Sequence, residues 1–169
     1  GLILLFLLVA YRDPVDLLLG LSALLLTLVW TFGFMGYAGI PFSDAIVSVF
    51  PLLLAVGIDF GIHAINRYRE ARRDESSVEV AMTRSMRQLN TAFLIVTATT
   101  VCSFAANLAS PLGSLREFGI VAAVGMIFTF VLFVVYLPAA KVTVDRLRQR
   151  LPVPAFGTTP IISEGSRLA

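Results

Sequence analysis

The feature that most constrains this chain is a set of long stretches without charged residues. No Asp, Glu, Lys or Arg occurs over residues 17–43, 88–115 or 118–140. A soluble helix of that length would need other protein around every side, and a chain of 169 residues cannot cover three such helices. Each stretch is long enough to cross a bilayer, which takes about 20 apolar residues of helix. The sequence therefore predicts an integral membrane protein of the all-α class.

The composition agrees with this class and excludes others. Hydrophobic residues make up 57% of the chain and charged residues 14%, with a mean hydropathy of +0.87. Soluble domains have about 45–50% apolar and about 25% charged residues. The single cysteine, Cys102, excludes a disulfide framework or a thiolate metal cluster. A net charge of +2 does not favour nucleic acid as a partner.

The pattern of uncharged stretches and helix-ending residues predicts a five-helix transmembrane bundle. Residues 1–11 are apolar but would cover only about 16 Å of helix, half of a hydrocarbon core. We interpret them as the last part of a span, with a short re-entrant or interfacial segment as the alternative. Four complete spans are expected at 15–37, 43–66, 91–108 and 118–141. The sequence is accordingly treated as a fragment of a longer protein.

Basic residues predict the orientation of these spans. They gather in the loop between the spans at 43–66 and 91–108 and beyond the last span, whereas the loops around Gly39 and Pro111 hold a single arginine, Arg116. Lys and Arg concentrate on the cytoplasmic side of membrane proteins, so we place both basic segments on that side. The expected location of the protein is the cell membrane. Within the first of them, residues 74–90 show apolar positions at three- and four-residue steps, which predicts a short amphipathic helix at the interface. Residues 1–141 would form the transmembrane domain, and 142–169 a cytoplasmic linker or tail.

Asp59 is the residue whose position is hardest to explain by folding alone. It precedes Arg67 by about 12 Å of helix, which places it inside the hydrocarbon zone. An aspartate there costs about 2.5–3.5 kcal/mol on insertion scales, and ionisable residues within spans are functional by default. We interpret Asp59 as a proton or ion site, against the alternative of a structural carboxylate bonded to a neighbouring helix. His63 shares its helix face and would relay or tune the proton, or else be an interfacial histidine.

Small and polar residues accompany this acid. Gly57 and Gly61 bracket Asp59 at a spacing that lets another helix approach closely. On the next span, Thr100, Ser103 and Asn107 share one face and could form a relay to Asp59, or their side chains could bond to their own helix. Two ionisable residues are too few for a metal site.

The segment 55–63, which reads A-V-G-I-D-F-G-I-H and runs into N-R-Y-R-E at 66–70, resembles a known family. It is similar to the fourth transmembrane helix of resistance–nodulation–division (RND) transporters of the MMPL type. These are related to hopanoid exporters and, through the five-helix sterol-sensing domain, to Patched and the Niemann–Pick type C proteins. The resemblance covers nearly the whole chain and includes Phe118, Gly119 and Gly125 in the last span.

The resemblance implies roles for individual residues. Asp59 matches the proton-coupling aspartate of the family, and Gly57 matches the glycine two residues before it. Ala55 stands where some relatives have glycine, which preserves a small side chain for packing but not a strict glycine. The family's proteins have twelve spans in two repeats, each with an extracytoplasmic domain. This chain would then be helices two to six of one repeat, with the tail favouring the first.

The function implied is export of lipids or other hydrophobic molecules, driven by the proton gradient. The expected partners are membrane lipids, a hydrophobic substrate, and a second transmembrane repeat in the same protein or in another subunit. No cofactor is expected beyond the coupling ion, a proton, with sodium as the alternative. A different hypothesis is a non-transporting sterol-sensing-type module that binds a lipid and regulates a partner. An enzyme is not expected, since no hydrolase motif such as G-x-S-x-G or H-E-x-x-H occurs.

Overall fold

A computed structural model describes residues 14–75 and 77–150, and this part of the chain contains helices and no strand. Four helices in it are long and apolar enough to cross a membrane. The elements, in chain order, are α2 (Pro14–Tyr37), α3 (Asp44–Val47), α4 (Val49–Asp74), α5 (Val78–Ala105), the 3-10 turn η1 (Ala106–Ala109), α6 (Gly113–Val131), the π-helical turn η2 (Leu132–Tyr136) and α7 (Leu137–Arg150). The all-α membrane architecture is therefore confirmed.

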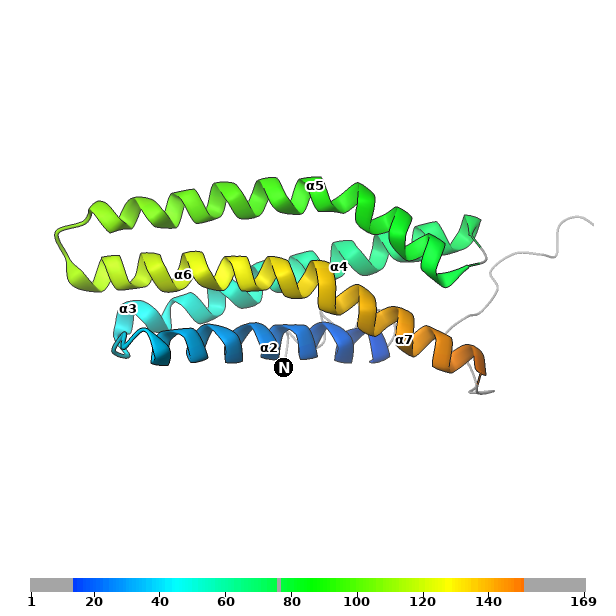
Figure 1. Cartoon of the computed structure of the whole chain (residues 1–169), viewed down its shortest axis with the longest axis horizontal. Coiled ribbons are helices and arrows are strands. Elements are labelled where there is room, and N and C mark those ends of the chain that lie inside the picture. Colours follow the sequence, from blue (N-terminus) through cyan, green and yellow to red (C-terminus); the bar gives the residue numbers. More distant parts are fainter. Residues whose placement is uncertain (1–13, 76, 151–169) are drawn as a thin grey trace, which may run out of the picture.

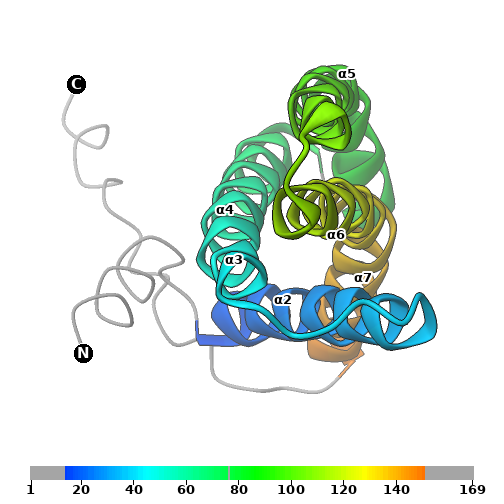
Figure 2. The same ribbon diagram turned by 90° about the vertical axis from the view of Figure 1, so that its left-hand side faces the viewer.

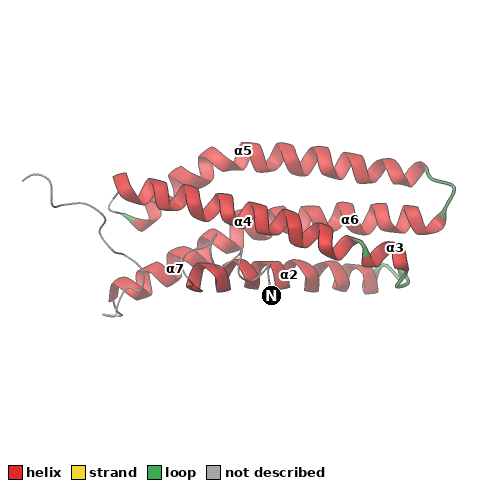
Figure 3. Cartoon of the chain, turned by 180° about the vertical axis from the view of Figure 1, so that it is seen from behind, coloured by secondary structure: helices red, strands yellow, loops and turns green. Residues whose placement is uncertain are grey.

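The long helices lie side by side and alternate in direction (Figure 1). Viewed along the bundle, α6 lies inside, and it contacts α2, α4 and α5 (Figure 2). From behind, α3 and α4 lie nearest the viewer, so α4 forms an outer side of the described bundle (Figure 3). The end that holds Pro14, Asp74 and Val78 also carries the basic residues of the loop after α4, and the positive-inside rule makes it the cytoplasmic end.

Two apolar clusters hold the helices together at different levels. One contains Leu24, Phe60, Phe93 and Phe133, where the Phe60 and Phe93 rings stack with their centroids 4.2 Å apart. The other contains Met35, Leu53 and Met126 toward the opposite end. Since lipid is as apolar as these side chains, the clusters stabilise the bundle through close packing rather than through removal from water.

The helix bounds confirm the span predicted at 15–37 and extend the other three. α4 runs to Asp74 rather than residue 66, and the last span continues through η2 and α7 to Arg150, beyond the predicted boundary at 141. The extra turns of α4 remain helical because Tyr68 packs against Val78 and Met82 of α5. Residues 1–13, 76 and 151–169 lie outside the described residues, and with them the predicted partial span and most of the predicted tail.

The amphipathic segment predicted at 74–90 does not form a separate element. Residues 78–90 are the first turns of α5, which continues without a break into the span. Its apolar positions Val78, Ala81 and Met82 are buried, but against the cytoplasmic extension of α4. The amphipathic pattern therefore reflects packing against another helix, which the sequence alone does not distinguish from packing on a membrane surface.

Candidate functional site

Asp59 lies in α4, midway between the two ends of the span Asp44–Asp74. Its side chain is 68% exposed on the surface of the described bundle, and that of His63 is 61% exposed. His63 Nε2 lies 3.4 Å from Asp59 Oδ1, one helical turn away. The structure therefore brings the two predicted site residues together, on an outward face rather than in the bundle interior.

The exposed face of α4 forms a continuous stripe around this pair. Pro51, Ala55, Asp59 and His63 recur at four-residue steps, and all are exposed. Residues four apart lie on one side of a helix, so the stripe runs along the outer side of α4. Ala55, one turn before Asp59, leaves room for a neighbouring backbone beside the acid.

A charged group on this face is not stable against lipid. An aspartate in the middle of a membrane faces a bundle interior, a water-filled cavity or a charged partner. Within residues 14–75 and 77–150, the only side chain that forms an ion pair with Asp59 is that of His63. The stripe on α4 is consequently a surface at which Asp59 requires polar surroundings or a partner, and among the described residues only His63 supplies one.

The glycines that bracket Asp59 lie on the buried side of α4 rather than on this outer face. Gly57 and Gly61 are buried. A Cβ atom at Gly57 would meet the side chain of Leu24 and would lie 3.2 Å from Phe133 Cε2. The close approach predicted by the glycine spacing is therefore real at Gly57, but it joins α4 to α2 and η2 inside the bundle.

The polar residues of α5 were predicted to form a relay toward Asp59. The Thr100 hydroxyl donates to the Val96 carbonyl at 2.7 Å, and the Ser103 hydroxyl donates to the Thr99 carbonyl at 2.8 Å. Asn107 lies against Gly119 of α6. In the described structure these side chains make no hydrogen bond with Asp59. Their relay role stays a prediction, with no geometry here that supports it.

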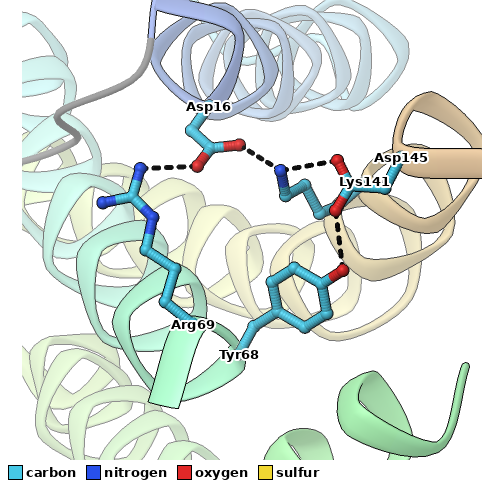
Figure 4. Close-up of polar contacts among 5 residues, drawn as sticks. All are labelled: Asp16, Tyr68, Arg69, Lys141 and Asp145. Carbon is cyan, nitrogen blue, oxygen red and sulfur yellow. Dashed lines mark hydrogen bonds and ion pairs between the residues drawn. The ribbon is translucent and has the colours of Figure 1, made fainter. Parts of the chain in front are cut away.

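A second polar site, which sequence reasoning missed, lies at the cytoplasmic end of the bundle. We call it the cytoplasmic ion network, and it consists of Asp16, Tyr68, Arg69, Lys141 and Asp145 (Figure 4). Asp16 is 1% exposed, and its carboxylate is held between Arg69 Nη2 and Lys141 Nζ, each at 2.7 Å. Lys141 Nζ also lies 2.8 Å from Asp145 Oδ1.

Tyr68 completes the network from α4. Its hydroxyl donates to Asp145 Oδ2 at 2.6 Å, and its ring lies under Lys141 Nζ, 5.6 Å from the ring centroid. The five side chains come from three helices, α2, α4 and α7, so the network ties the cytoplasmic ends of these helices together. Buried charges require such complete pairing, because a buried charge without a partner costs several kcal/mol.

The sequence held a signal for this network. Asp16 and Lys141 each stand at the edge of an uncharged stretch, and both edges lie on the cytoplasmic side if the five predicted spans alternate in direction. Opposite charges at one membrane level are candidates for an ion pair. Arg69 and Asp145, however, are surrounded by other charges, and no spacing rule selects them.

A bundle of membrane-spanning helices with an acid at mid-span and basic residues at one end is a multi-pass integral membrane protein. The sequence model of the MMPL family matches residues 1–154. The chain belongs to the MMPL family. The resemblance to RND transporters of the MMPL type is thereby confirmed.

The chain matches parts of two longer curated proteins. It is 35% identical over 144 residues to MJ1562 of Methanocaldococcus jannaschii, whose name describes it as a membrane protein. It is 23% identical over 149 residues to MmpL8 of Mycobacterium bovis, whose name describes it as a transport protein. The matches cover 85% and 86% of this chain but only 37% and 14% of the relatives. No solved structure matches the chain.

Proposed function

We propose that this chain is the transmembrane part of a proton-driven exporter of lipids or other hydrophobic molecules, in which Asp59 binds the coupling proton. Family membership and the transport protein among the relatives support the transporter class. The observation that carries the coupling role is the position of Asp59, an acid at mid-span on an exposed face of the bundle.

The chemistry of this position explains how a proton could drive movement. A charged Asp59 requires polar surroundings, whereas a protonated Asp59 tolerates close apolar contact. Proton binding would therefore change how closely a covering helix approaches the stripe on α4. A ligand shifts a conformational equilibrium by its difference in affinity for the two states, and here the ligand is the proton.

His63 would tune this step. With Nε2 at 3.4 Å from the carboxylate, it can donate a hydrogen bond to the charged form of Asp59. The covering element would be a second transmembrane repeat, supplied by the same protein or by another subunit. Ala55 would form the surface on which that repeat approaches Asp59 most closely.

The experiment uses the full-length protein in proteoliposomes with an imposed pH gradient. Proton flux, read from an interior pH dye, and release of a lipid substrate analogue are measured for the parent and for Asp59→Asn. The variant is expected to lose both while still inserting in the membrane. Asp44→Asn is the matched control, because Asp44 is an exposed acid at the other end of the span.

Two results would contradict the proposal. Proton-driven flux that persists in Asp59→Asn would remove the coupling role from this residue. A parent protein that binds lipid without a dependence on the gradient, and an Asp59→Asn variant that binds equally well, would favour the sterol-sensing-type module instead.

A further inference from the structure

An open cleft of about 420 Å³ lies between α5 and the π-helical end of the last span. Its walls are apolar on both sides, with Met82 and Met86 from α5 facing Val134 from η2 and Pro138 from α7. Three polar side chains, those of Thr83, Arg87 and Asn90, also line it. The cleft therefore combines an apolar trough with a cationic rim.

The irregular backbone of the last span accounts for the opening. A π-helical turn holds one extra residue, and a proline removes a backbone donor, so both change the direction of a helix. η2 ends at Tyr136 and Pro138 follows two residues later. In Figure 1, α7 accordingly inclines away from the axis of α6.

The cleft lies at the cytoplasmic boundary of the hydrocarbon core. Arg87 is the last charged residue before the uncharged stretch 88–115, and Lys141, three residues after Pro138, is the first after the stretch 118–140. Both edges fall at the level where phospholipid phosphates of the cytoplasmic leaflet lie.

Arg87 differs from the other arginines around it. Arg84 pairs with Glu75, Arg146 with Glu79, and Arg67 with Glu70. In residues 14–75 and 77–150, Arg87 has no hydrogen bond or ion pair. Its guanidinium is thus a charge without a protein partner, at the rim of an apolar cleft.

The residues that follow Arg87 on its helix face continue the same pattern. Asn90 lies one turn farther into the membrane, and Leu94 lies one turn beyond it with 53% of its surface exposed. Positions spaced three and four apart share a side of the helix. Going inward, that side offers a cation, then an amide, then an apolar surface.

We propose that this cleft binds an anionic phospholipid of the cytoplasmic leaflet. Its phosphate would contact the Arg87 guanidinium, which matches phosphate with paired donors. Asn90 would donate to the glycerol ester region, and one acyl chain would lie along Met86 and Val134. Basic pockets between membrane helices on the cytoplasmic side suit such headgroups.

The test measures lipid retention by the full-length protein. It is placed in nanodiscs of phosphatidylcholine with phosphatidylglycerol as the anionic lipid, and bound phosphatidylglycerol is counted by native mass spectrometry after release. Arg87→Gln is expected to lower retention about fivefold, the factor for one basic side chain at an anionic membrane surface. Arg73→Gln is the matched control, since Arg73 is an exposed arginine on the same side, and its retention should be unchanged.

A second pair of variants tests the cleft without changing charge. Val134→Trp fills the trough and should lower retention, whereas Val135→Trp, at a neighbouring position that is 62% exposed, should not. Arg87→Lys keeps a cation and should retain most of the lipid. These variants keep the proposal testable if Arg87→Gln does not fold.

Three outcomes would overturn it. Equal losses in Arg87→Gln and Arg73→Gln would mean that only general surface charge attracts the lipid. Equal retention of phosphatidylglycerol and phosphatidylcholine would remove the role of the cation. Displacement of the lipid by millimolar inorganic phosphate would mean that Arg87 holds a free anion and that the apolar walls bind nothing.

Discussion

α4 carries charged groups at two levels, and they differ in where their partners lie. Arg69, near its cytoplasmic end, belongs to the cytoplasmic ion network, in which every charge is paired inside the described bundle. Asp59, ten residues earlier, pairs only with His63 among the described residues and is exposed. A charge with internal partners stabilises the fold of this unit, whereas a mid-span charge without them is, in the proposed function, a site of proton coupling. The first kind should therefore affect stability, and the second kind activity.

The largest expected effect on stability is the loss of Asp16. Asp16→Ala leaves Lys141, which is 5% exposed, without one of its two carboxylate partners. Breaking a buried ion pair from one side costs about 3–5 kcal/mol. The measurement is thermal unfolding of the full-length protein in detergent, with Asp59→Asn as the comparison. If Asp59→Asn lowered the unfolding temperature as much as Asp16→Ala, the proposed difference between the two sites would be wrong.

Gly57→Ala probes the buried face of α4. The added methyl group would meet Leu24 and Phe133, and overpacking of this kind costs about 1–3 kcal/mol. Gly33→Ala is the control, because nothing lies within 4 Å of a Cβ atom there. The two variants are compared by the same unfolding measurement. An unfolding temperature for Gly57→Ala equal to that of Gly33→Ala would show that α2 and η2 do not pack tightly on α4.

Tyr68→Phe sharpens the role of the network without removing a charge. The variant lacks the hydroxyl that donates to Asp145 at 2.6 Å, and a hydrogen bond to a charged group contributes about 1.5–3 kcal/mol. We expect a loss near the lower end of that range, because Lys141 still pairs with Asp145. Tyr37→Phe, at a side chain that is 93% exposed, should leave the unfolding temperature unchanged. Equal unfolding temperatures for both variants would contradict the buried role of Tyr68.

Arg67→Gln should have the smallest effect. Arg67 pairs with Glu70, but both side chains are about half exposed. Exposed ion pairs of this kind contribute at most about 1 kcal/mol and are screened by salt. Unfolding measured at low and high salt should show a small difference that disappears at high salt. A loss comparable to that of Asp16→Ala would place Arg67 in a buried contact.

The sequence predicted the membrane class, the span at 15–37 and the shared helix face of Asp59 and His63, because these depend on hydropathy and on spacing within one helix. It did not predict the cytoplasmic ion network, since Asp16, Arg69 and Asp145 come from different helices and meet only after packing. For the hydroxyls of Thr100 and Ser103, the sequence predicted the shared helix face but left the hydrogen-bond partners open. They share a helix face, as predicted, but their hydrogen bonds go to their own backbone. Spacing in the sequence determines which residues share a helix face, but it does not show which other residues that face contacts.

The π-helical turn η2 makes the contacts of the last span sensitive to the number of residues in it. Each residue advances a helix by about 100°, so the extra residue in η2 rotates all of α7 about the helix axis. Phe133 lies near the start of that turn and packs with Phe60, and Lys141 lies beyond it in α7 and pairs with Asp16. Deleting a single residue between them would turn Lys141 away by about a quarter of a rotation while Phe133 stayed in place. The aromatic contact and the ion pair therefore both depend on the number of residues between Phe133 and Lys141. Substitutions between these two residues should be tolerated better than an insertion or a deletion.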